Sequence, residues 1–470
     1  NLHERLGEQH WFGWADGGAA PMVRFGQEVR SHFLGHLGLI GTDEMFWPWV
    51  WGPGYQAYGQ DDRANDEVTK FARRQGGIAS YVHPAGADPF GDPAALGLPV
   101  GLVADGILGD VQALEIACLW TDELGTAEVW YQFLNLGWPV AATSGSDVML
   151  NFYRTMAPGA TRTYVHTGDA QDFDSYLAGV AAGRSFVTNG PLIEFEVEGA
   201  GPGETTPADG TAEWTLALHT AVGVSRVEII VNGEVAWSDE AGSGAHQRFS
   251  GSVEIPAGGW IAVRVVGPDT ESWPAMDSYA FAHSSPTWIG EVGSVDREAE
   301  LRSVATLRAA LVGAKASLLE GYEGADIPTL ISRFEAAEAA LDALRLAQTM
   351  TYKCVLAGIP GGGAKTVVLE DHILDRRAAV HELGRRIQAM NGIYRSGPDA
   401  GFDENDLRHL SETTEYAAAF HPGRLRPAAE ATSEGAASGI VAALRHLDCP
   451  DLKGIRIAIQ GLGAVGSSLA

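Results

Sequence analysis

The sequence predicts a multidomain α/β protein, and three changes of pattern along its 470 residues indicate how it is divided. From residue 1 to about 190, short apolar runs alternate with helical stretches, which is typical of an α/β domain. Residues 191–292 are β-rich runs separated by Gly, Pro and Ser, which predict a small β-sandwich. From Asp296 the pattern becomes helical, and beyond residue 336 glycine clusters interrupt it.

The composition also changes along the chain. Lys and Arg number 32 against 60 Asp and Glu, so the net charge is -28. All 13 Trp lie at or before Trp288, whereas residues 336–470 contain 14 basic and 16 acidic residues and are nearly neutral. This contrast predicts at least two modules. The excess of acid argues against nucleic acid or an anionic membrane as a partner.

Cysteine content and hydropathy indicate a cytoplasmic protein. Cys118, Cys354 and Cys449 are too few for a disulfide framework, and we expect them to be reduced thiols. No apolar run approaches the ~20 residues that a membrane span requires.

Individual elements of the first module follow from their periodicity. ANDEVTKFARRQG (64–76) predicts a helix that Gly76 ends, and TAEVWYQFLNLG (126–137) repeats this pattern. GIASYVHP (77–84) and PVAATSGSD (139–147) predict buried strands that end in polar residues. In α/β folds the site lies at the carboxyl ends of strands, so these residues are candidates for function.

Four polar residues stand where short apolar runs end: Glu28, His36, His83 and Asp147. Carboxylate oxygen and imidazole nitrogen are ligands for divalent metals, and a bound water then has a pKa near ~7, as hydrolysis requires. The alternative for each residue is a structural role, since single histidines are more often hydrogen-bonded core or surface residues.

The motifs GQEVRSHFLGHLG, YVHP, SGSD, PGATRTYV and AGRSFVTNGP occur in this order and resemble the PHP (polymerase and histidinol phosphatase) superfamily, in its CehA/McbA-like branch. The resemblance covers about residues 1–330. It implies a distorted β/α barrel that hydrolyses esters or phosphoesters with Zn, Mn or Fe. It assigns metal ligation to Glu28, His36, His83 and Asp147, and it places Arg184 and Asn189 near the site.

The sequence departs from that family at two places. The family's opening His-x-His is absent, and its Asp-x-His near the end is replaced by Asp147-Val148-Met149. His32 is an alternative to His36, and Glu115 is a further candidate carboxylate. A scaffold with a partial or inactive site therefore remains an alternative.

In the last module, MTYKCVLAGIPGGGAKTVV (350–368) places two lysines around Gly361, Gly362 and Gly363. A lysine held beside such a turn and partly desolvated can have a lowered pKa and act on a carbonyl or amine. The alternative is a glycine-rich turn with two solvated lysines that have no role in catalysis. Further on, LKGIRIAIQ predicts a strand that leads into a GxGxxG turn and then a helix. This order is the fingerprint of dinucleotide binding.

With SGPDAG (396–401) and AEATSEG (429–435) between them, these motifs resemble the Glu/Leu/Phe/Val amino-acid dehydrogenases. The resemblance implies reversible NAD-dependent deamination of an L-amino acid by a homo-oligomer. Carried over by motif, Lys353 binds the substrate carboxylate, Lys365 is the catalytic lysine and Asp399 is its acid/base partner. The implied cofactor-binding residues are Thr432 near the nicotinamide and, at the phosphates, Gly461, Gly463 and Gly466.

Here too there are departures, since Ala364 replaces the glycine beside the catalytic lysine and the cofactor domain has at most 40 residues. We therefore expect a fusion of two partial enzymes, with three functions open: dehydrogenase, metal-dependent hydrolase, or inactive hybrid. The expected domains are a PHP-like domain (1–190), a β-sandwich (191–292), a helical segment (293–335), a dehydrogenase substrate and dimerisation domain (336–430) and the start of a Rossmann domain (431–470).

Overall fold

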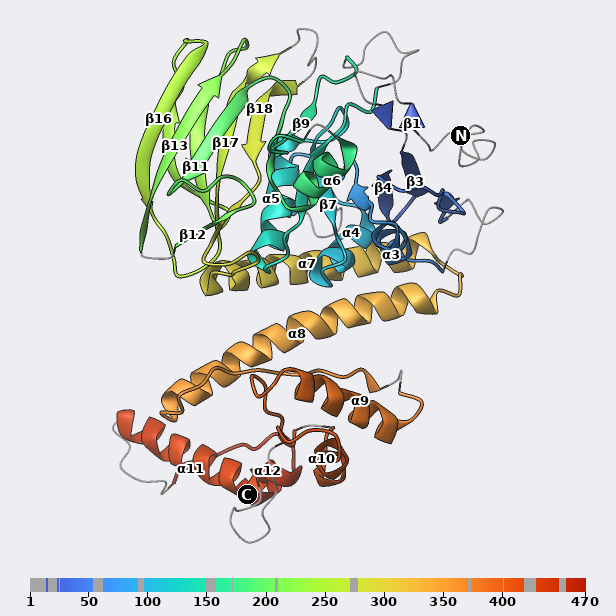
Figure 1. The fold of residues 1–470 in the computed structure, drawn as a ribbon. Helices are drawn as coiled ribbons and strands as arrows, with labels where there is room; N and C mark the ends of the chain where they lie inside the picture. Colours follow the sequence, from blue (N-terminus) through green and yellow to red (C-terminus); the bar gives the residue numbers. More distant parts are fainter. Residues whose placement is uncertain are drawn as a thin grey trace. The chain divides into compact units, whose positions relative to one another are not determined.

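The computed structural model divides the chain into two compact units, Asn1–Leu369 and Glu370–Ala470, and each is described by itself (Figure 1). Among the helices it describes, none has the length and apolar character needed to cross a membrane. The described residues are 14–15, 23–24, 26–53, 62–91, 97–148, 157–170, 172–207, 210–270, 278–370, 373–399, 401–417, 428–447 and 454–470.

A six-stranded sheet forms the first part of unit 1, in the order β5-β3-β4-β6-β7-β8. Strands β6, β7 and β8 run parallel, whereas β4 is antiparallel to both β3 and β6. Within the described residues β5 and β8 are its edges, so the sheet is open and a closed β/α barrel is not shown. The strands are β3 Gln27–Ser31, β4 Gly35–Ile40, β5 Val50–Trp51, β6 Ile78–Tyr81, β7 Ala113–Ala117 and β8 Ala141–Ser144, and a separate ribbon pairs β1 Trp14–Ala15 with β2 Val23–Arg24.

Helices alternate with these strands, which confirms the predicted α/β pattern. They are α3 (Asp66–Arg74), α4 (Val100–Ile107) and α5 (Glu123–Asn135). The first ends as predicted, because Gly76 has a φ of +73° that other residues adopt at a cost. Asp122 caps α5 by accepting the backbone N–H of Gly125 at 2.8 Å.

Two packed sheets follow in the region where the sequence predicts a β-sandwich. Alternating residues of β11 and β13 face inward and meet apolar residues of β14 and β17, which form one core. Figure 1 shows β11, β13 and β16 as one layer beside β17 and β18. The strands are β11 Leu192–Val197, β12 Thr205–Thr206, β13 Thr211–His219, β14 Arg226–Val231, β15 Glu234–Glu240, β16 His246–Glu254, β17 Trp260–Thr270, β18 Ser278–Ser284 and β19 Thr287–Ile289.

An Asn-Gly pair between two β-rich runs is a strong hairpin signal, and Asn232-Gly233, between β14 and β15, has that geometry. Asn232 has a φ of +50° and Gly233 a φ of +88°. Two consecutive positive φ values are those of a type I′ turn, whose twist matches the strands that it joins.

The sandwich begins earlier in the chain than predicted. Strands β9 (Arg162–Val165) and β10 (Ser185–Thr188), which flank α6 (Phe173–Ala181), belong to the sheet that contains β17 and β18. Phe186 of β10 pairs with Ser284 of β18. The predicted boundary at 190 therefore separates strands that share hydrogen bonds, because strand pairing between distant segments leaves no local signal.

Two long helices complete unit 1, α7 (Arg297–Gly321) and α8 (Pro328–Leu356). The buried residues of α8 all lie in its first half: Leu330, Phe334, Ala337 and Leu341. They join the core of the six-stranded sheet. The predicted boundary at 335/336 thus falls inside one continuous helix.

Unit 2 contains the helices α9 (Arg376–Ala389), α10 (Glu404–Ser411), α11 (Ala428–His446) and α12 (Ala464–Leu469). The segment 454–460, predicted as a strand, forms none, and Ile455 and Ile457 are 39% and 50% exposed. A strand requires a partner for its backbone groups. The described residues of unit 2 contain isolated bridges but no strand that could pair with this segment.

Candidate metal centre and dehydrogenase motifs

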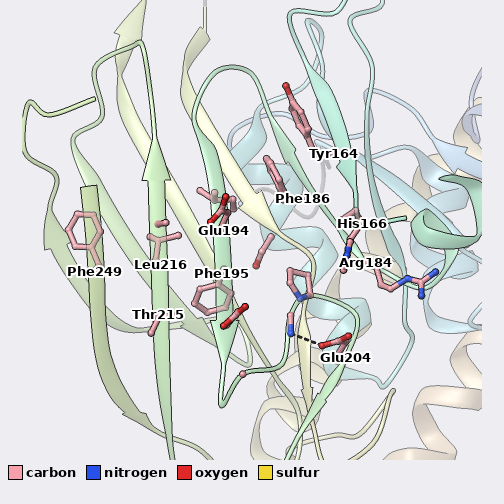
Figure 2. A pocket seen from close by; sticks show the side chains of 18 of the residues that line it. Tyr164, His166, Arg184, Phe186, Glu194, Phe195, Glu204, Thr215, Leu216 and Phe249 are labelled. Atoms are coloured by element: carbon pink, nitrogen blue, oxygen red, sulfur yellow. Dashed lines mark hydrogen bonds between the residues drawn. The ribbon is translucent and has the colours of Figure 1, made fainter. Parts of the chain in front are cut away.

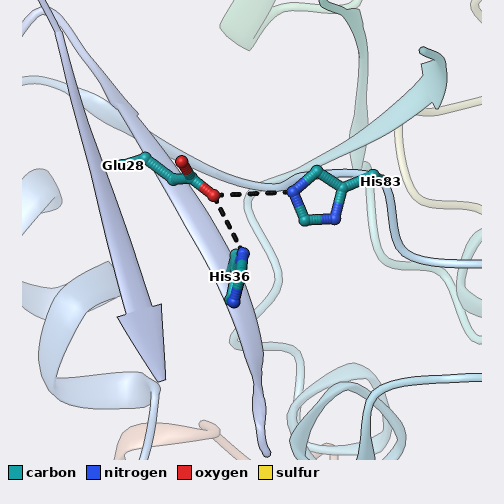
Figure 3. A group of neighbouring side chains, drawn as sticks. All are labelled: Glu28, His36 and His83. Carbon is teal, nitrogen blue, oxygen red and sulfur yellow. Dashed lines mark hydrogen bonds and ion pairs between the residues drawn. The ribbon is translucent and has the colours of Figure 1, made fainter. Parts of the chain in front are cut away.

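Neighbouring strands of the six-stranded sheet bring Glu28, His36 and His83 together (Figure 3). Glu28 lies on β3 and His36 on the antiparallel β4, where His36 faces Arg30 across the two strands. His83 follows the end of β6, the next strand in the sheet. The Glu28 Oε1 atom is 2.9 Å from His36 Nδ1 and 3.5 Å from His83 Nε2.

This geometry fits a divalent metal. One ligand atom from each of the three side chains lies within 4.8 Å of the others. Their side chains are 25%, 21% and 21% exposed, so a ligand from solvent could reach the group. Two imidazoles and one carboxylate with an open fourth position are a known arrangement for catalytic zinc.

Charge around the group favours an ionised carboxylate. Burial raises the pKa of Glu28, but hydrogen bonds from His36, His83 and Arg30 outweigh it and hold that pKa well below its usual range. Arg30 Nη2 donates to Glu28 Oε2 at 2.7 Å. Burial lowers the pKa of His83, but the hydrogen bond to Glu28 and the charge of Glu115 raise it more. Sequence reasoning missed Arg30, although the Glu-x-Arg spacing puts both on one face of a strand.

Glu115, on β7, contacts the backbone of His83. Its Oε2 accepts the backbone N–H of His83 at 2.7 Å, and its side chain is buried. Burial raises the pKa of this carboxyl to about 7. The buried thiol of Cys118 lies close by, and burial raises its pKa as well. Glu115 thus supports the backbone of a candidate ligand and is not in the group itself.

The fourth predicted ligand, Asp147, is near this group but outside it. It follows β8, is exposed, and its charge contributes to the raised pKa of His83. Met149 lies outside the described residues. The alternative ligand His32 has its ring centre 6.4 Å from that of His36, and it is not in the group either.

Arg184 and Asn189 have other surroundings. Asn189 is buried in the sandwich sheet, where its amide donates to Tyr279 O at 2.6 Å and its carbonyl oxygen accepts from Phe281 N at 2.8 Å. Arg184 lines a cleft of about 910 Å³ together with Tyr164 and Phe186, whose rings stack 5.0 Å apart (Figure 2). None of the three grouped side chains lines this cleft.

The two predicted lysines lie at the end of unit 1. Lys353 is exposed in the last turn of α8, and Lys365 is half-buried in the loop that follows. Gly363 of that loop donates its N–H to Thr351 Oγ1 at 2.8 Å, and a Cβ there would lie 2.2 Å from Thr351 N. Gly363 therefore allows the loop to lie against the helix, whereas nothing lies within 4 Å of a Cβ built on Gly361 or Gly362. Ala364, which replaces the glycine beside the predicted catalytic lysine, is not among the residues with positive φ, so its side chain causes no backbone strain.

The glycine turn of the dinucleotide fingerprint is formed although the strand before it is not. Gly461 has a φ of +88°, Gly463 is the N-cap of α12, and a Cβ on Gly466 would lie 2.0 Å from Gly461 O. Gly461 thus meets a backbone requirement of the turn and Gly466 a steric one, whereas nothing lies within 4 Å of a Cβ built on Gly463. In the same unit Asp399 and Thr432 are exposed.

Residues 332–416 match the family model of the Glu/Leu/Phe/Val dehydrogenase dimerisation domain. The chain is 37% identical over 134 residues to L-tryptophan dehydrogenase of Nostoc punctiforme, which is 28% of this chain and 38% of that protein. It is 38% identical over 141 residues to leucine dehydrogenase of Bacillus cereus, which is 29% of this chain and 38% of that protein. The part of the chain that begins at residue 332, called the dehydrogenase-like segment from here on, is thus similar to oxidoreductases that act on amino acids.

The crystal structure of L-tryptophan dehydrogenase from Nostoc punctiforme was also found, at 36% identity and a TM-score of 0.23, with 28% of this chain and 38% of that chain covered. The chain therefore spans little more than a third of the length of these relatives.

Proposed function

We propose that the dehydrogenase-like segment carries the substrate-binding and catalytic residues of an NAD-dependent L-amino-acid dehydrogenase. The observation that supports this proposal is the 37% to 38% identity to tryptophan and leucine dehydrogenases, together with the match to their dimerisation domain. The reaction is the reversible oxidative deamination of an L-amino acid to a 2-oxo acid and ammonia. A homo-oligomer formed through this segment is part of the proposal.

The residues have separate roles in this reaction. Lys353 binds the substrate carboxylate as a point charge, and Lys365 polarises the substrate carbonyl. Asp399 exchanges protons with the reacting nitrogen or water. NAD would supply the hydride acceptor, Thr432 would lie near the nicotinamide, and Gly461, Gly463 and Gly466 would hold the phosphates.

An assay of amino-acid oxidation tests this proposal. With L-leucine, L-phenylalanine or L-tryptophan, the full chain should reduce NAD, and Lys365→Ala should lower the rate by about 10²–10⁴-fold because it removes the polarising group. Lys315→Ala is the control, since Lys315 pairs with Glu338 on α8 at 3.0 Å and has no proposed part in the reaction. Absence of NAD reduction with every amino acid, or equal rates for the two variants, would refute the proposal.

A second candidate function is metal-dependent hydrolysis of an ester or phosphoester in unit 1, and the grouping of Glu28, His36 and His83 is the observation that favours it. These residues would hold Zn, Mn or Fe, with Asp147 as a further ligand. The metal would supply Lewis acidity toward the substrate oxygen. Arg30 keeps Glu28 ionised, and Glu115 holds the His83 backbone in place.

Metal content distinguishes this function from the first. The purified chain should contain one or more Zn, Mn or Fe ions and hydrolyse p-nitrophenyl esters or phosphates. His83→Ala should reduce both properties. His219→Ala is a matched control, because His219 also lies beside a second histidine, His246, at 2.7 Å, but outside the candidate group. Metal-free protein, or identical metal content in the two variants, would contradict this function.

A further inference from the structure

Unit 2 contains another group of potential ligands, at the contact between α9 and α10 (Figure 1). The two helices pack through Val380, Ile387, Leu407 and Leu410. His381 follows the first of these residues and His409 precedes the last, so both imidazoles are placed at the rim of this small core. Their ring centres are 6.0 Å apart.

Glu412 connects the two imidazoles at the end of α10. Its Oε2 lies 2.9 Å from His381 Nε2, and its Oε1 lies 3.2 Å from His409 Nδ1. One ligand atom from each of the three residues lies within 4.8 Å of the others. Each histidine is 23% exposed and the glutamate 44%, so the group is accessible from solvent.

We propose that His381, His409 and Glu412 bind a divalent transition metal of the Zn²⁺ class, at a site separate from the candidate centre of unit 1. Nitrogen and oxygen ligands bind zinc at about 2.0–2.2 Å in a tetrahedron, which separates ligand atoms by roughly 3.4 Å. The two nitrogen–oxygen separations, 2.9 and 3.2 Å, are about 0.5 and 0.2 Å shorter than this value, and one ligand atom of each residue lies within 4.8 Å of the others. Small side-chain movements would therefore complete the site, and the bound metal replaces the two hydrogen bonds. A water completes the fourth position.

Helix packing preorganises these ligands, which reduces the entropy that binding must overcome. His381 is held by α9, and His409 and Glu412, three residues apart, are held by the last turn of α10. Bound metal links the two helices directly. Since the unfolded chain cannot keep this geometry, binding stabilises the fold of unit 2.

Arg377 opposes binding at the same site. Its Nη2 lies 2.9 Å from Glu412 Oε2, so its charge repels a cation and competes for the carboxylate. Removal of this charge should therefore favour the metal, and Arg377→Gln should strengthen zinc binding several-fold. Zinc bound elsewhere on the chain would not respond in this way.

Zinc binding to the full chain tests the proposal by equilibrium dialysis. A His36→Ala/His83→Ala background removes the candidate centre of unit 1, and this protein should still bind one zinc per chain. In that background His381→Gln or His409→Gln should weaken the remaining site about tenfold or more. His446→Gln, at an exposed position of α11, is the matched control and should change nothing.

Failure to bind zinc in that background, with circular dichroism showing it folded, would overturn the proposal. So would equal zinc binding by the His381→Gln and His446→Gln variants. If the background protein does not fold, the otherwise native chain provides the comparison, in which His381→Gln should lose one zinc equivalent that His446→Gln retains. If His381→Gln loses metal and His83→Ala does not, the hydrolase proposal alone is refuted. If His83→Ala loses metal and His381→Gln does not, the site in unit 2 alone is refuted.

Discussion

His83 and Asp147 each follow a strand of the six-stranded sheet, and their φ values are +37° and +42°. Neither residue is a glycine, so each such conformation costs about 1–3 kcal/mol and persists only where the surroundings fix it. For His83 the buried carboxylate of Glu115 provides this support by accepting its backbone N–H. Residues held in this way concentrate at functional sites, which is consistent with the candidate metal centre.

A second buried carboxyl, Glu123, predicts how stability depends on pH. It lies in the first turn of α5 and accepts a hydrogen bond from Ser278 Oγ at 3.0 Å. Burial raises the pKa of Glu123 from 4.5 to about 7. The folded protein thus favours the neutral acid, so this contribution to stability is complete below about pH 4.5 and is lost as the pH rises through about 7.

Glu123→Gln should therefore be more stable than the original protein at pH 8, by up to about 3 kcal/mol, and should gain little at pH 5. Urea unfolding at the two pH values measures this difference. Glu320→Gln, on the exposed face of α7, controls for the loss of a negative charge. An equal gain at both pH values would contradict the assignment.

At the scale of elements, helix α8 contains both residues of the unit 1 core and the start of the match to the dehydrogenase dimerisation domain. The match to the dehydrogenase dimerisation domain begins at residue 332, yet the first turns of α8 belong to the core of unit 1. Arg333 lies in these turns. Its Nη2 atom is 2.7 Å from Asp105 Oδ1, and it also pairs with Asp110 and Asp66. The start of the dehydrogenase-like segment is therefore part of the structure of unit 1.

Arg333→Ala should destabilise unit 1 by about 3–5 kcal/mol, because it leaves the buried Asp105 without its charged partner. Asp105 is 2% exposed and Arg333 is 13% exposed. Arg345→Ala on the same helix is the control: Arg345 is 58% exposed, its contact with Asp342 is 3.5 Å, and its loss should cost less than about 1 kcal/mol. Tryptophan fluorescence during urea unfolding measures the free energy of unfolding of both variants. A similar loss of stability in the two would refute this role for Arg333.

Local sequence predicted most elements but not their partners. Helix α3 forms where its own residues specify helical periodicity, and the turn at Asn232-Gly233 forms where its residues accept positive φ. The segment 454–460 has the composition of a strand but remains unpaired in the described part of unit 2. Helix signals are contained within a few turns, whereas a strand depends on hydrogen bonds from residues far along the chain.

At the scale of the whole molecule, the two units differ in the size of their cores. The core of unit 1 extends over the six-stranded sheet, the sandwich, α7 and α8. The core cluster described in unit 2 has only four buried residues: Val380, Ile387, Leu407 and Leu410. Since stability rises with buried apolar area, unit 2 should be the less stable of the two.

Heating should therefore unfold the chain in two steps. All 13 Trp lie at or before Trp288, so tryptophan fluorescence reports unit 1 alone, whereas circular dichroism at 222 nm reports the helices of both units. Circular dichroism should show an earlier transition that fluorescence does not. Coincident transitions by the two probes would show that the chain unfolds as one cooperative unit.

The sequence by itself determined the α/β class, the β-rich strands of the sandwich, the Asn232-Gly233 turn and the positive φ at Gly461, because periodicity and φ preference act over a few residues. The tertiary structure alone decided that Glu28, His36 and His83 meet while Asp147 stays outside their group. It also decided that β10 pairs with β18 and that α8 crosses the predicted boundary at 335/336. The physical reason is that strand order and helix packing join residues that are distant in the chain, and no local pattern records these contacts.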